Sequence, residues 1–362
     1  MTKPFHSTPI LIHTSYIIQI QKKMPFQIKT IENEQEDLQF LGFFSIFKES
    51  FKIILTWPKI FIQITLSLIL PQSFLFLANN WISKLLLTKI HQNDTYKVAS
   101  PPSHSVHSEW ISYWLIKAVY VIFSMVLSLF IISAVVYIVA CIYTGKDIAF
   151  KKVMSVVPKV WKQLMVTFLC NFCIMFTYLC ILSLVIVLPI IFFYKPERGG
   201  RHLGTSQIGV LVIVLLISTL LILGFFYITM IWQLANVVSV MEKSCGFKAL
   251  KKSKKLIKGK MGTSLGIFLV TNLFAIPILI LIEKLARFGI LVGICLGVLS
   301  LVLWTFFTLF GLVVQTVFYL VCKSYHHESI DKSLLSDHLD VYLAEYVPLK
   351  SEGIHLETLH HV

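Results

Sequence analysis

The stretch GFKALKKSKKLIKGKMGTSLGIFLVTNLF, residues 246–274, joins two kinds of sequence that decide how this chain folds. Its first half is crowded with lysines: seven fall within the fourteen residues from Phe247 to Lys260. Its second half is almost continuous hydrocarbon and opens an apolar run close to the ~20 residues that a membrane-spanning helix needs. A short basic segment that leads directly into an apolar run predicts a helix at the membrane surface followed by a span.

The composition of the whole chain is typical of a membrane protein. Apolar residues make up 56% of the 362 residues and charged residues only 14%, whereas a soluble domain has about a quarter. The formal net charge of +14 would also suit a nucleic-acid binder. Because the lysines stand beside apolar runs, we expect anionic membrane lipids as the partner and no nucleic acid.

Six apolar runs are long enough to cross a bilayer, so the sequence predicts an all-α integral membrane bundle of about six transmembrane helices. The expected spans are Ile60–Ala78, Ala118–Tyr143, Met165–Tyr194, Ile208–Trp232, Ser264–Ile282 and Phe288–Cys322. They divide the chain into an N-terminal cytosolic extension (1–39), a six-span domain (40–322) and an acidic cytosolic tail (323–362). Residues 1–23 contain no acid, so they are either a targeting extension or precede a translation start at Met24.

Basic residues are spread unevenly over the loops, which predicts the orientation. The loops after the second and fourth spans hold thirteen lysines, whereas the three alternate loops hold eight basic residues. Positive residues favour the cytosolic side, so we expect both termini in the cytosol. The membrane would be that of the endoplasmic reticulum, another secretory compartment or the cell surface. The sequon Asn93-Asp94-Thr95 then falls in an outer loop and predicts glycosylation at Asn93.

The pair Phe-Lys recurs at Phe47, Phe150 and Phe247, each time in a basic segment that leads into an odd-numbered span. This recurrence predicts three repeats, each an interfacial amphipathic helix followed by a helix pair. In the second copy the apolar face comprises Phe150, Val153, Met154, Val157, Val160, Trp161 and Leu164. In the first it comprises Phe40, Phe43, Phe44, Phe47, Phe51 and Ile54. In the third it thins to Phe247, Leu250, Ile257 and Met261, and Lys254 interrupts it.

The lysines of these segments are the predicted lipid-binding residues. They are Lys248, Lys251, Lys252, Lys254, Lys255, Lys258 and Lys260 of the third copy, with Lys151 and Lys152 of the second. Each lysine near an anionic surface contributes ~1 kcal/mol, screened by salt. The alternative is that the charges only set the topology during insertion. A phosphate on Ser253, in KKSKK, would cancel part of the charge.

Inside the predicted spans the polar chemistry is sparse. No Asp, Glu, Lys, Arg or His lies at the centre of a span, which argues against a proton-coupled carrier or an intramembrane protease. We identify no catalytic residue, no metal site and no cofactor. The polar intramembrane groups are amides, chiefly Asn171, Asn236, Asn272 and Gln315. They either bond to neighbouring helices or line a path for a small solute.

Two further features concern partners. Gly289, Gly293 and Gly297 recur every four residues and form a smooth strip for packing another helix, either within the monomer or in a homo-oligomer. The tail holds seven acids against three lysines and contains YVPL (346–349) and DKSLL (331–335). These patterns resemble motifs that sorting adaptors read, so a cytosolic protein partner is expected at the tail.

Three stretches carry a resemblance to a known family: EDLQFLGFFSIFKES (36–50), IWQLANVVSVMEKSCGFKALKKS (231–253) and CKSYHHESIDKSLLSDHLDVYLAEYVPLKS (322–351). They are similar to a plant family of multi-pass membrane proteins, largely uncharacterised, some members of which are labelled binders of a polyadenylate-binding protein. The repeat plan more loosely resembles membrane domains fused to bacterial glycerophosphodiester phosphodiesterases. That catalytic domain is missing from these residues, so the resemblance implies a fold and a membrane location but no activity.

Three functional hypotheses follow. The first is a non-enzymatic endomembrane protein that engages anionic lipid at the cytosolic leaflet and organises or transports lipids. The second is a small-solute channel or transporter that uses the amides. The third is a membrane adaptor whose tail recruits a cytosolic partner.

Overall fold

The computed structural model describes residues 41–96, 105–145, 148–193, 205–242, 244–284 and 290–326. Within these ranges every regular element is a helix, and six helices are long and apolar enough to cross a membrane. They are Pro58–Gln92, Glu109–Thr144, Phe150–Leu188, Val212–Met241, Met261–Ile282 and Val292–Tyr325. The prediction of an all-α, six-span membrane protein is confirmed.

Ten elements make up the described chain. They are α2 (Phe43–Thr56), α3 (Pro58–Ile64), the π-helix η1 (Thr65–Ile69), α4 (Leu70–Tyr96), α5 (Ser105–Thr144), α6 (Phe150–Phe193), α7 (Thr205–Met241), α8 (Phe247–Ile257), α9 (Met261–Lys284) and α10 (Ile290–Tyr325). Helices α3, η1 and α4 follow one another without a break. The wide turn of η1 ends two residues before Pro71, whose missing N–H disturbs the helical hydrogen-bond ladder there.

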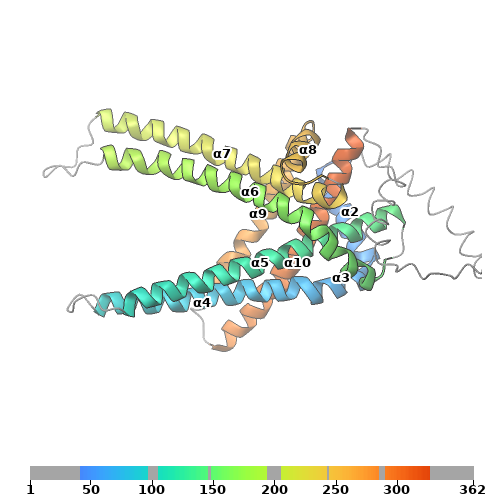
Figure 1. The fold of residues 1–362 in the computed structure, drawn as a ribbon, viewed down its shortest axis with the longest axis horizontal. Helices are drawn as coiled ribbons and strands as arrows, with labels where there is room; N and C mark the ends of the chain where they lie inside the picture. Colours follow the sequence, from blue (N-terminus) through green and yellow to red (C-terminus); the bar gives the residue numbers. More distant parts are fainter. Residues whose placement is uncertain are drawn as a thin grey trace, which may run out of the picture.

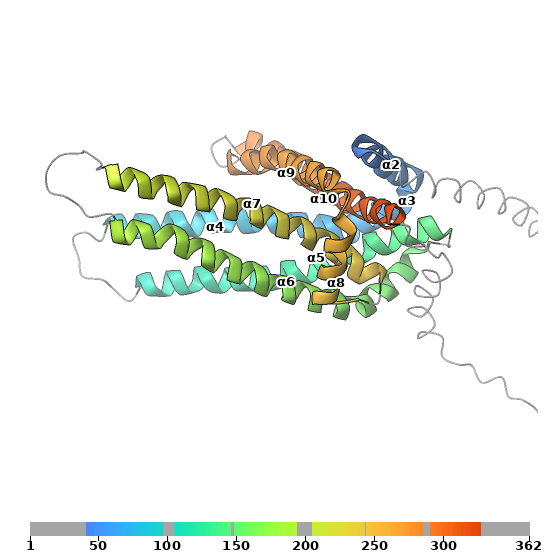
Figure 2. The same ribbon diagram turned by 90° about the horizontal axis from the view of Figure 1, so that it is seen from above.

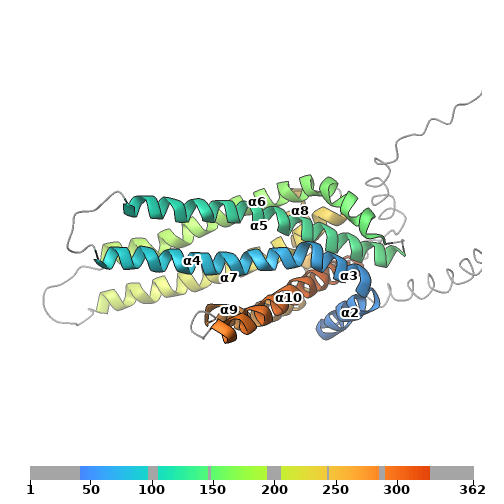
Figure 3. The ribbon, with the colours of Figure 1, turned by 90° about the horizontal axis from the view of Figure 1, so that it is seen from below.

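The six long helices form three antiparallel pairs: α4 with α5, α6 with α7, and α9 with α10 (Figure 1). Helices α2 and α8, the first turns of α6 and the last turns of α10 gather at one end of the bundle, on the right in Figure 1. We call this end the basic end, because it carries Lys151, Lys152 and the lysines of α8. Helix α8 lies against the last turns of α7 (Figure 2), and α2 lies against α10 (Figure 3).

The main buried core lies in the half of the bundle next to the basic end. Its main stretches lie at 129–141 of α5, 153–164 of α6, 234–241 of α7 and 309–322 of α10. Away from this end the α4/α5 and α6/α7 pairs diverge (Figure 1), and apolar side chains such as Leu220 (69% exposed) face outward. Since lipid tails are as apolar as leucine, such a surface is stable within a bilayer without a protein core.

The three Phe-Lys segments occupy equivalent places in the core, as the repeat predicts. The third and sixth residues after each phenylalanine are buried in every copy: Ser50 and Ile53, Val153 and Val156, and Leu250 and Ser253. The links to the following span differ, however. Helix α2 ends before Trp57 and Pro58, and α8 ends at a turn through Gly259.

In the second copy the surface segment and the span are one helix, α6. The expected separate interfacial helix is therefore wrong there, because Pro158 lies inside a continuous helix instead of beginning a new one as Pro58 does. The predicted apolar face of this segment is correct, since Val153, Val157 and Val160 are fully buried or nearly so.

The other two predicted faces are divided between protein contact and the outer surface. On α2, Phe44 and Phe51 face outward, while Ile46 and Ile53 pack against the bundle. In the third copy, Leu250 and Ile257 of α8 are buried, but Phe247 of α8 and Met261, the first residue of α9, are exposed. The buried face of α8 is completed by Ala249, Ser253 and Leu256. Helical spacing groups residues on a face, but it cannot distinguish contact with protein from contact with lipid, and here protein covers one side.

The expected first outer loop, residues 79–110, is also shorter than predicted. Helix α4 continues to Tyr96 and α5 begins at Ser105. The polar residues in these turns do not stop a helix, because α4 and α5 support each other along their length. Lys117 Nζ donates to Asn79 Oδ1 at 3.2 Å, and Lys89 lies 3.6 Å from Glu109.

Candidate functional site

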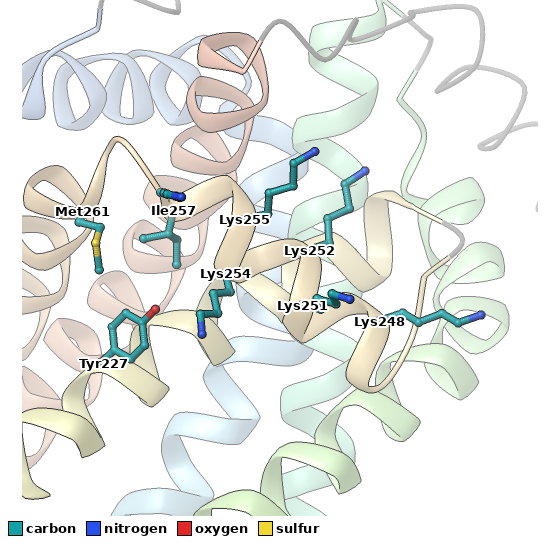
Figure 4. A pocket seen from close by; sticks show the side chains of 9 residues that line it. Tyr227, Lys248, Lys251, Lys252, Lys254, Lys255, Ile257 and Met261 are labelled. Atoms are coloured by element: carbon teal, nitrogen blue, oxygen red, sulfur yellow. The ribbon is translucent and has the colours of Figure 1, made fainter.

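A pocket of about 820 Å³ opens at the basic end beside α8 (Figure 4). Its lining comprises Tyr227 of α7 and Met261 of α9 together with residues of α8 and Lys258, which directly follows α8. The residues of α8 are Lys248, Lys251, Lys252, Lys254, Lys255 and Ile257. Six of its nine lining residues are lysines. The sequence prediction and the pocket therefore converge on the same segment, and the volume lies within the ~300–1,000 Å³ of ligand sites.

Helix α8 presents these lysines because its other face is fixed to the bundle. Ala249, Leu250 and Leu256 are buried. Ser253 is fully buried, and its hydroxyl donates to the Ile231 carbonyl of α7 at 2.7 Å. A phosphate on Ser253 would require this face to leave the bundle, so the structure disfavours the switch expected from KKSKK.

The turn that leads into α8 depends on Gly246. Its φ of +61° belongs to the left-handed region, which glycine adopts without strain. Its N–H donates to Thr167 Oγ1 of α6 at 2.9 Å, and a Cβ added here would lie 3.2 Å from Cys170 Sγ. The turn is thereby held on α6, and this contact sets the direction in which α8 crosses the end of α7.

Glu242, just after α7, binds two of the nearby cations. Its Oε2 lies 2.6 Å from Lys252 Nζ and its Oε1 lies 3.4 Å from Lys323 Nζ. Tyr319 of α10 also donates its hydroxyl to Oε1 at 2.7 Å. Glu242 thus joins α7, α8 and α10, and it neutralises Lys252, one of the lysines that the sequence predicts as lipid ligands.

The remaining lysines of the pocket differ in whether they have a hydrogen-bond or ion-pair partner. Lys248, Lys251, Lys254 and Lys258 are exposed. In the described part of the chain they have no hydrogen bond or ion pair. In Figure 4 the side chain of Lys254 extends toward Tyr227, whereas Lys252 and Lys255 extend to the opposite side of α8. These four lysines and the Tyr227 hydroxyl form a set of donors available to an anion, and we call them the anion set.

The end of α10 closes the far side of α8. Tyr325 lies beside Gly259, whose φ is +99°, and a Cβ added to Gly259 would lie 2.6 Å from Tyr325 Cε1. Lys260 Nζ lies 5.2 Å from the centre of the Tyr325 ring, and His326 Nε2 lies 3.1 Å from the Leu256 carbonyl oxygen. Lys260 therefore supports the α8–α9 turn and does not line the pocket.

Lys151 and Lys152, the two predicted lipid ligands on α6, are exposed at the basic end but do not line this pocket. They belong to the same charged surface, outside the pocket itself. Of the nine predicted lysines, four form the anion set.

The intramembrane amides are not in equivalent environments. Asn171 and Asn236 are buried, and their Oδ1 atoms have no hydrogen-bond partner in the ranges that the structure describes. Gln315 is half-buried. Asn272 is exposed, and its Nδ2 donates to the Phe268 carbonyl of its own helix at 2.7 Å. Asn272 therefore lies on the outer surface of α9.

Other predicted residues lie partly outside the described residues. Gly289 does so entirely, while Gly293 and Gly297 lie on α10 and are half-buried. Asn93 lies in the last turns of α4, and its side chain is outside the described residues. In the described part of the chain there is no group of three or more His, Cys, Asp or Glu side chains placed to hold a metal ion.

Three important residues were not found from the sequence. Tyr227 stands in an apolar run and looks like part of a span, and Glu242 is a single acid between a span and the lysines. Gln72 was also missed, although its Nε2 donates to Ser124 Oγ and Ser128 Oγ of α5 at 2.8 and 3.2 Å. The position of Glu242 was the one usable signal, because an isolated acid beside a cluster of lysines is a natural ion-pair partner.

Residues 31–359 match the family described as Domain of unknown function (DUF8558). No curated protein and no solved structure matches the chain.

Proposed function

Since the chain belongs to the DUF8558 family, whose description assigns no activity, we propose a function from its own residues. It is a non-enzymatic, multi-pass endomembrane protein that engages anionic lipid at the cytosolic leaflet through the anion set. By holding such lipids beside the bundle it organises them or assists their transport. The plant source expected from the resemblance, the cytosolic termini and the secretory-pathway location are parts of the same proposal.

The observation that carries the proposal is the pocket lined by lysines that the protein leaves uncompensated. Glu242 neutralises Lys252, whereas the described residues supply no counter-ion to Lys248, Lys251, Lys254 or Lys258. Four lysines near an anionic surface together contribute about 4 kcal/mol at most, screened by salt. A role in topology alone would require the positive charges but not a pocket.

The apolar surface around the basic end supports a membrane-bound ligand. Phe247 and Met261 are exposed beside the lysines, at 65% and 47%. On the neighbouring repeat, Phe44 and Leu55 of α2 are exposed at 82% and 62%. Side chains of this kind enter the boundary between headgroups and acyl chains, which brings the lysines to the level of lipid phosphates.

The test compares two variants with the same loss of charge. The first, K248Q/K251Q/K254Q/K258Q, removes the anion-set cations. The control, K48Q/K59Q/K151Q/K152Q, removes four exposed lysines of the basic end that do not line the pocket. Lipids that co-purify with the full chain are counted by native mass spectrometry.

We expect the first variant to lose anionic lipids while the control retains most of them. Both should still insert, since the altered side chains are exposed. Equal retention of anionic lipid by wild type and the first variant would leave the lysines with a role in topology alone and would overturn the proposal.

A solute path is the second candidate, and one observation favours it. The unpartnered oxygens of buried Asn171 and Asn236 are unusual, because buried polar atoms are normally hydrogen-bonded. Asn272 faces outward, so the expected path would lose one of its amides. No comparable observation favours self-association through the glycine strip. None favours an adaptor that recruits a partner through the tail.

A further inference from the structure

We infer that the lipid bound by the anion set carries a headgroup with several phosphomonoesters, of the phosphorylated-inositol class. This inference rests on the proposed function and specifies its ligand. It follows from three properties of the pocket in the described part of the chain: the number of free cations, the absence of a free acid, and the apolar residues at one side.

The donors of the anion set suit concentrated negative charge. Lysine ammonium groups act as point charges with freely rotating donors, and four of them line one pocket together with Tyr227. A phosphodiester with a single negative charge would leave most of these cations unpaired. A headgroup with two additional phosphomonoesters carries about −4 at neutral pH, since each has a charge of ≈ −1.5 to −2, and it would balance all four.

The pocket has no partner for the ammonium of a phosphatidylserine or phosphatidylethanolamine headgroup. The one acid among the described residues next to α8 is Glu242, and its two oxygens already face Lys252, Lys323 and the Tyr319 hydroxyl. An ammonium brought among the free lysines would be repelled. Zwitterionic and serine headgroups are therefore disfavoured relative to a headgroup that is only anionic.

The lining also distinguishes a lipid from a soluble polyphosphate. Ile257 and Met261 form an apolar side of the pocket, and Met261 is exposed at the start of the fifth span. A glycerol backbone and the first acyl carbons would contact Met261, which is 47% exposed, whereas Ile257 is already buried. A free inositol phosphate would leave Met261 in water.

The experiment measures retention of three probes by the full chain in detergent, using native mass spectrometry. The probes are phosphatidylserine, phosphatidate and phosphatidylinositol 4,5-bisphosphate, added at equal concentration. We expect the bisphosphate lipid to be retained about tenfold better than phosphatidylserine, since its additional negative charges are attracted by lysines that phosphatidylserine leaves unpaired. Phosphatidate, with one phosphomonoester, should fall between the two.

Two single substitutions test the residues that would hold the additional phosphates. The variant K254Q should lose most of the preference for the bisphosphate lipid, because Lys254 extends toward Tyr227 in the pocket (Figure 4). The variant Y227F should weaken retention of that lipid by about three- to tenfold, the usual net effect of one hydrogen bond. An unchanged preference in both variants would overturn the assignment of the headgroup to the anion set.

The outcomes separate this inference from the proposed function. Equal retention of phosphatidylserine and the bisphosphate lipid, both lost in K248Q/K251Q/K254Q/K258Q, would overturn the headgroup class and leave lipid binding intact. Retention that the fourfold variant does not change would overturn both. Displacement of the bisphosphate lipid by soluble inositol trisphosphate at equal concentration would show that the apolar side contributes nothing, and would overturn the assignment to a lipid.

Discussion

Glu242 shows how much one side chain decides at the basic end. It follows the last turn of α7, and its two oxygens reach lysines on α8 and α10. Its side chain is only 14% exposed, and Lys323 is 19% exposed. Ion pairs with this little solvent exposure are weakly screened, so loss of one partner leaves cations without compensation.

The substitution E242Q should therefore destabilise the protein by about 1–3 kcal/mol, seen as a lower melting temperature in detergent. Glutamine preserves the size of the side chain and can still accept from Tyr319, so the loss reports the charge. The control is E49Q, whose partner Lys52 lies 3.8 Å away with 61% of its side chain exposed. That exposed pair should contribute less than about 0.5 kcal/mol. Equal melting temperatures for the two variants would contradict this role for Glu242.

Gly246 and Gly259 bound α8 and fix its place, although little in the sequence indicates this. Both have a positive φ, at +61° and +99°, a backbone conformation that residues other than glycine rarely adopt. In the third repeat Gly259 stands where the first two repeats have a proline before a lysine. Tyr325 fills the space beside Gly259, although it stands 66 residues later in the chain. Only the packing of α10 brings the two residues together.

At the scale of elements, the α6/α7 pair shows how two long apolar helices are held in register. The Tyr178 hydroxyl of α6 donates to the Leu221 carbonyl of α7 at 2.6 Å. The phenol lies directly over Gly224, where an added Cβ would overlap the hydroxyl oxygen. A small residue opposite a polar one is a common way to bring two helices together within a bilayer.

This contact predicts a strong coupling between two substitutions. Y178F should cost about 1 kcal/mol, the usual net value of one hydrogen bond. G224A should cost more, because the new methyl group displaces the phenol. In the double variant Y178F/G224A the conflict is relieved, so its melting temperature should exceed that of G224A alone.

A matched control for this cycle is G311A on α10, where an added Cβ meets nothing within 4 Å. Alanine favours a helix over glycine by about 1 kcal/mol, so G311A should leave the melting temperature unchanged or raise it. Additive effects of Y178F and G224A would mean that the two residues do not determine the register of the pair.

At the scale of the whole molecule, the bundle is polarised. Its core, the lysines of α8 and the ion pairs of Glu242 all lie at the basic end, while the opposite half is exposed apolar surface. Exposed aromatic residues mark the other boundary, with Trp81 on α4 and Trp114 on α5. Tryptophan favours membrane interfaces, so these residues mark a second membrane interface across the bundle from the basic end.

The proposed orientation predicts glycosylation of Asn93. This residue lies twelve positions after Trp81 on the same helix, about 18 Å further from the membrane at 1.5 Å per residue. Expressed in cells with a secretory pathway, the wild-type chain should migrate more slowly than N93Q, and an endoglycosidase should remove the difference. The variant K258N/K260T introduces a sequon at the basic end. Modification of that sequon in place of Asn93 would show that the protein has the opposite orientation.

The class, the number of spans and the segment that carries the pocket could all be predicted from the sequence. These follow from local physics, because a run of about 20 apolar residues is driven into a bilayer and must form a helix there. The lysines of residues 248–260 were likewise visible as a cluster, and the buried face of the second repeat followed from helical spacing.

Tertiary structure alone decided which of those lysines remain free. Glu242 neutralises Lys252, Tyr325 contacts Lys260, and Tyr227 joins the four lysines of the anion set. It also decided which faces of α2 and α8 meet protein and which remain exposed. The physical reason is that apolar side chains are equally stable against lipid and against other helices, so periodicity shows that a face is apolar, and only the packing of distant segments shows what covers it.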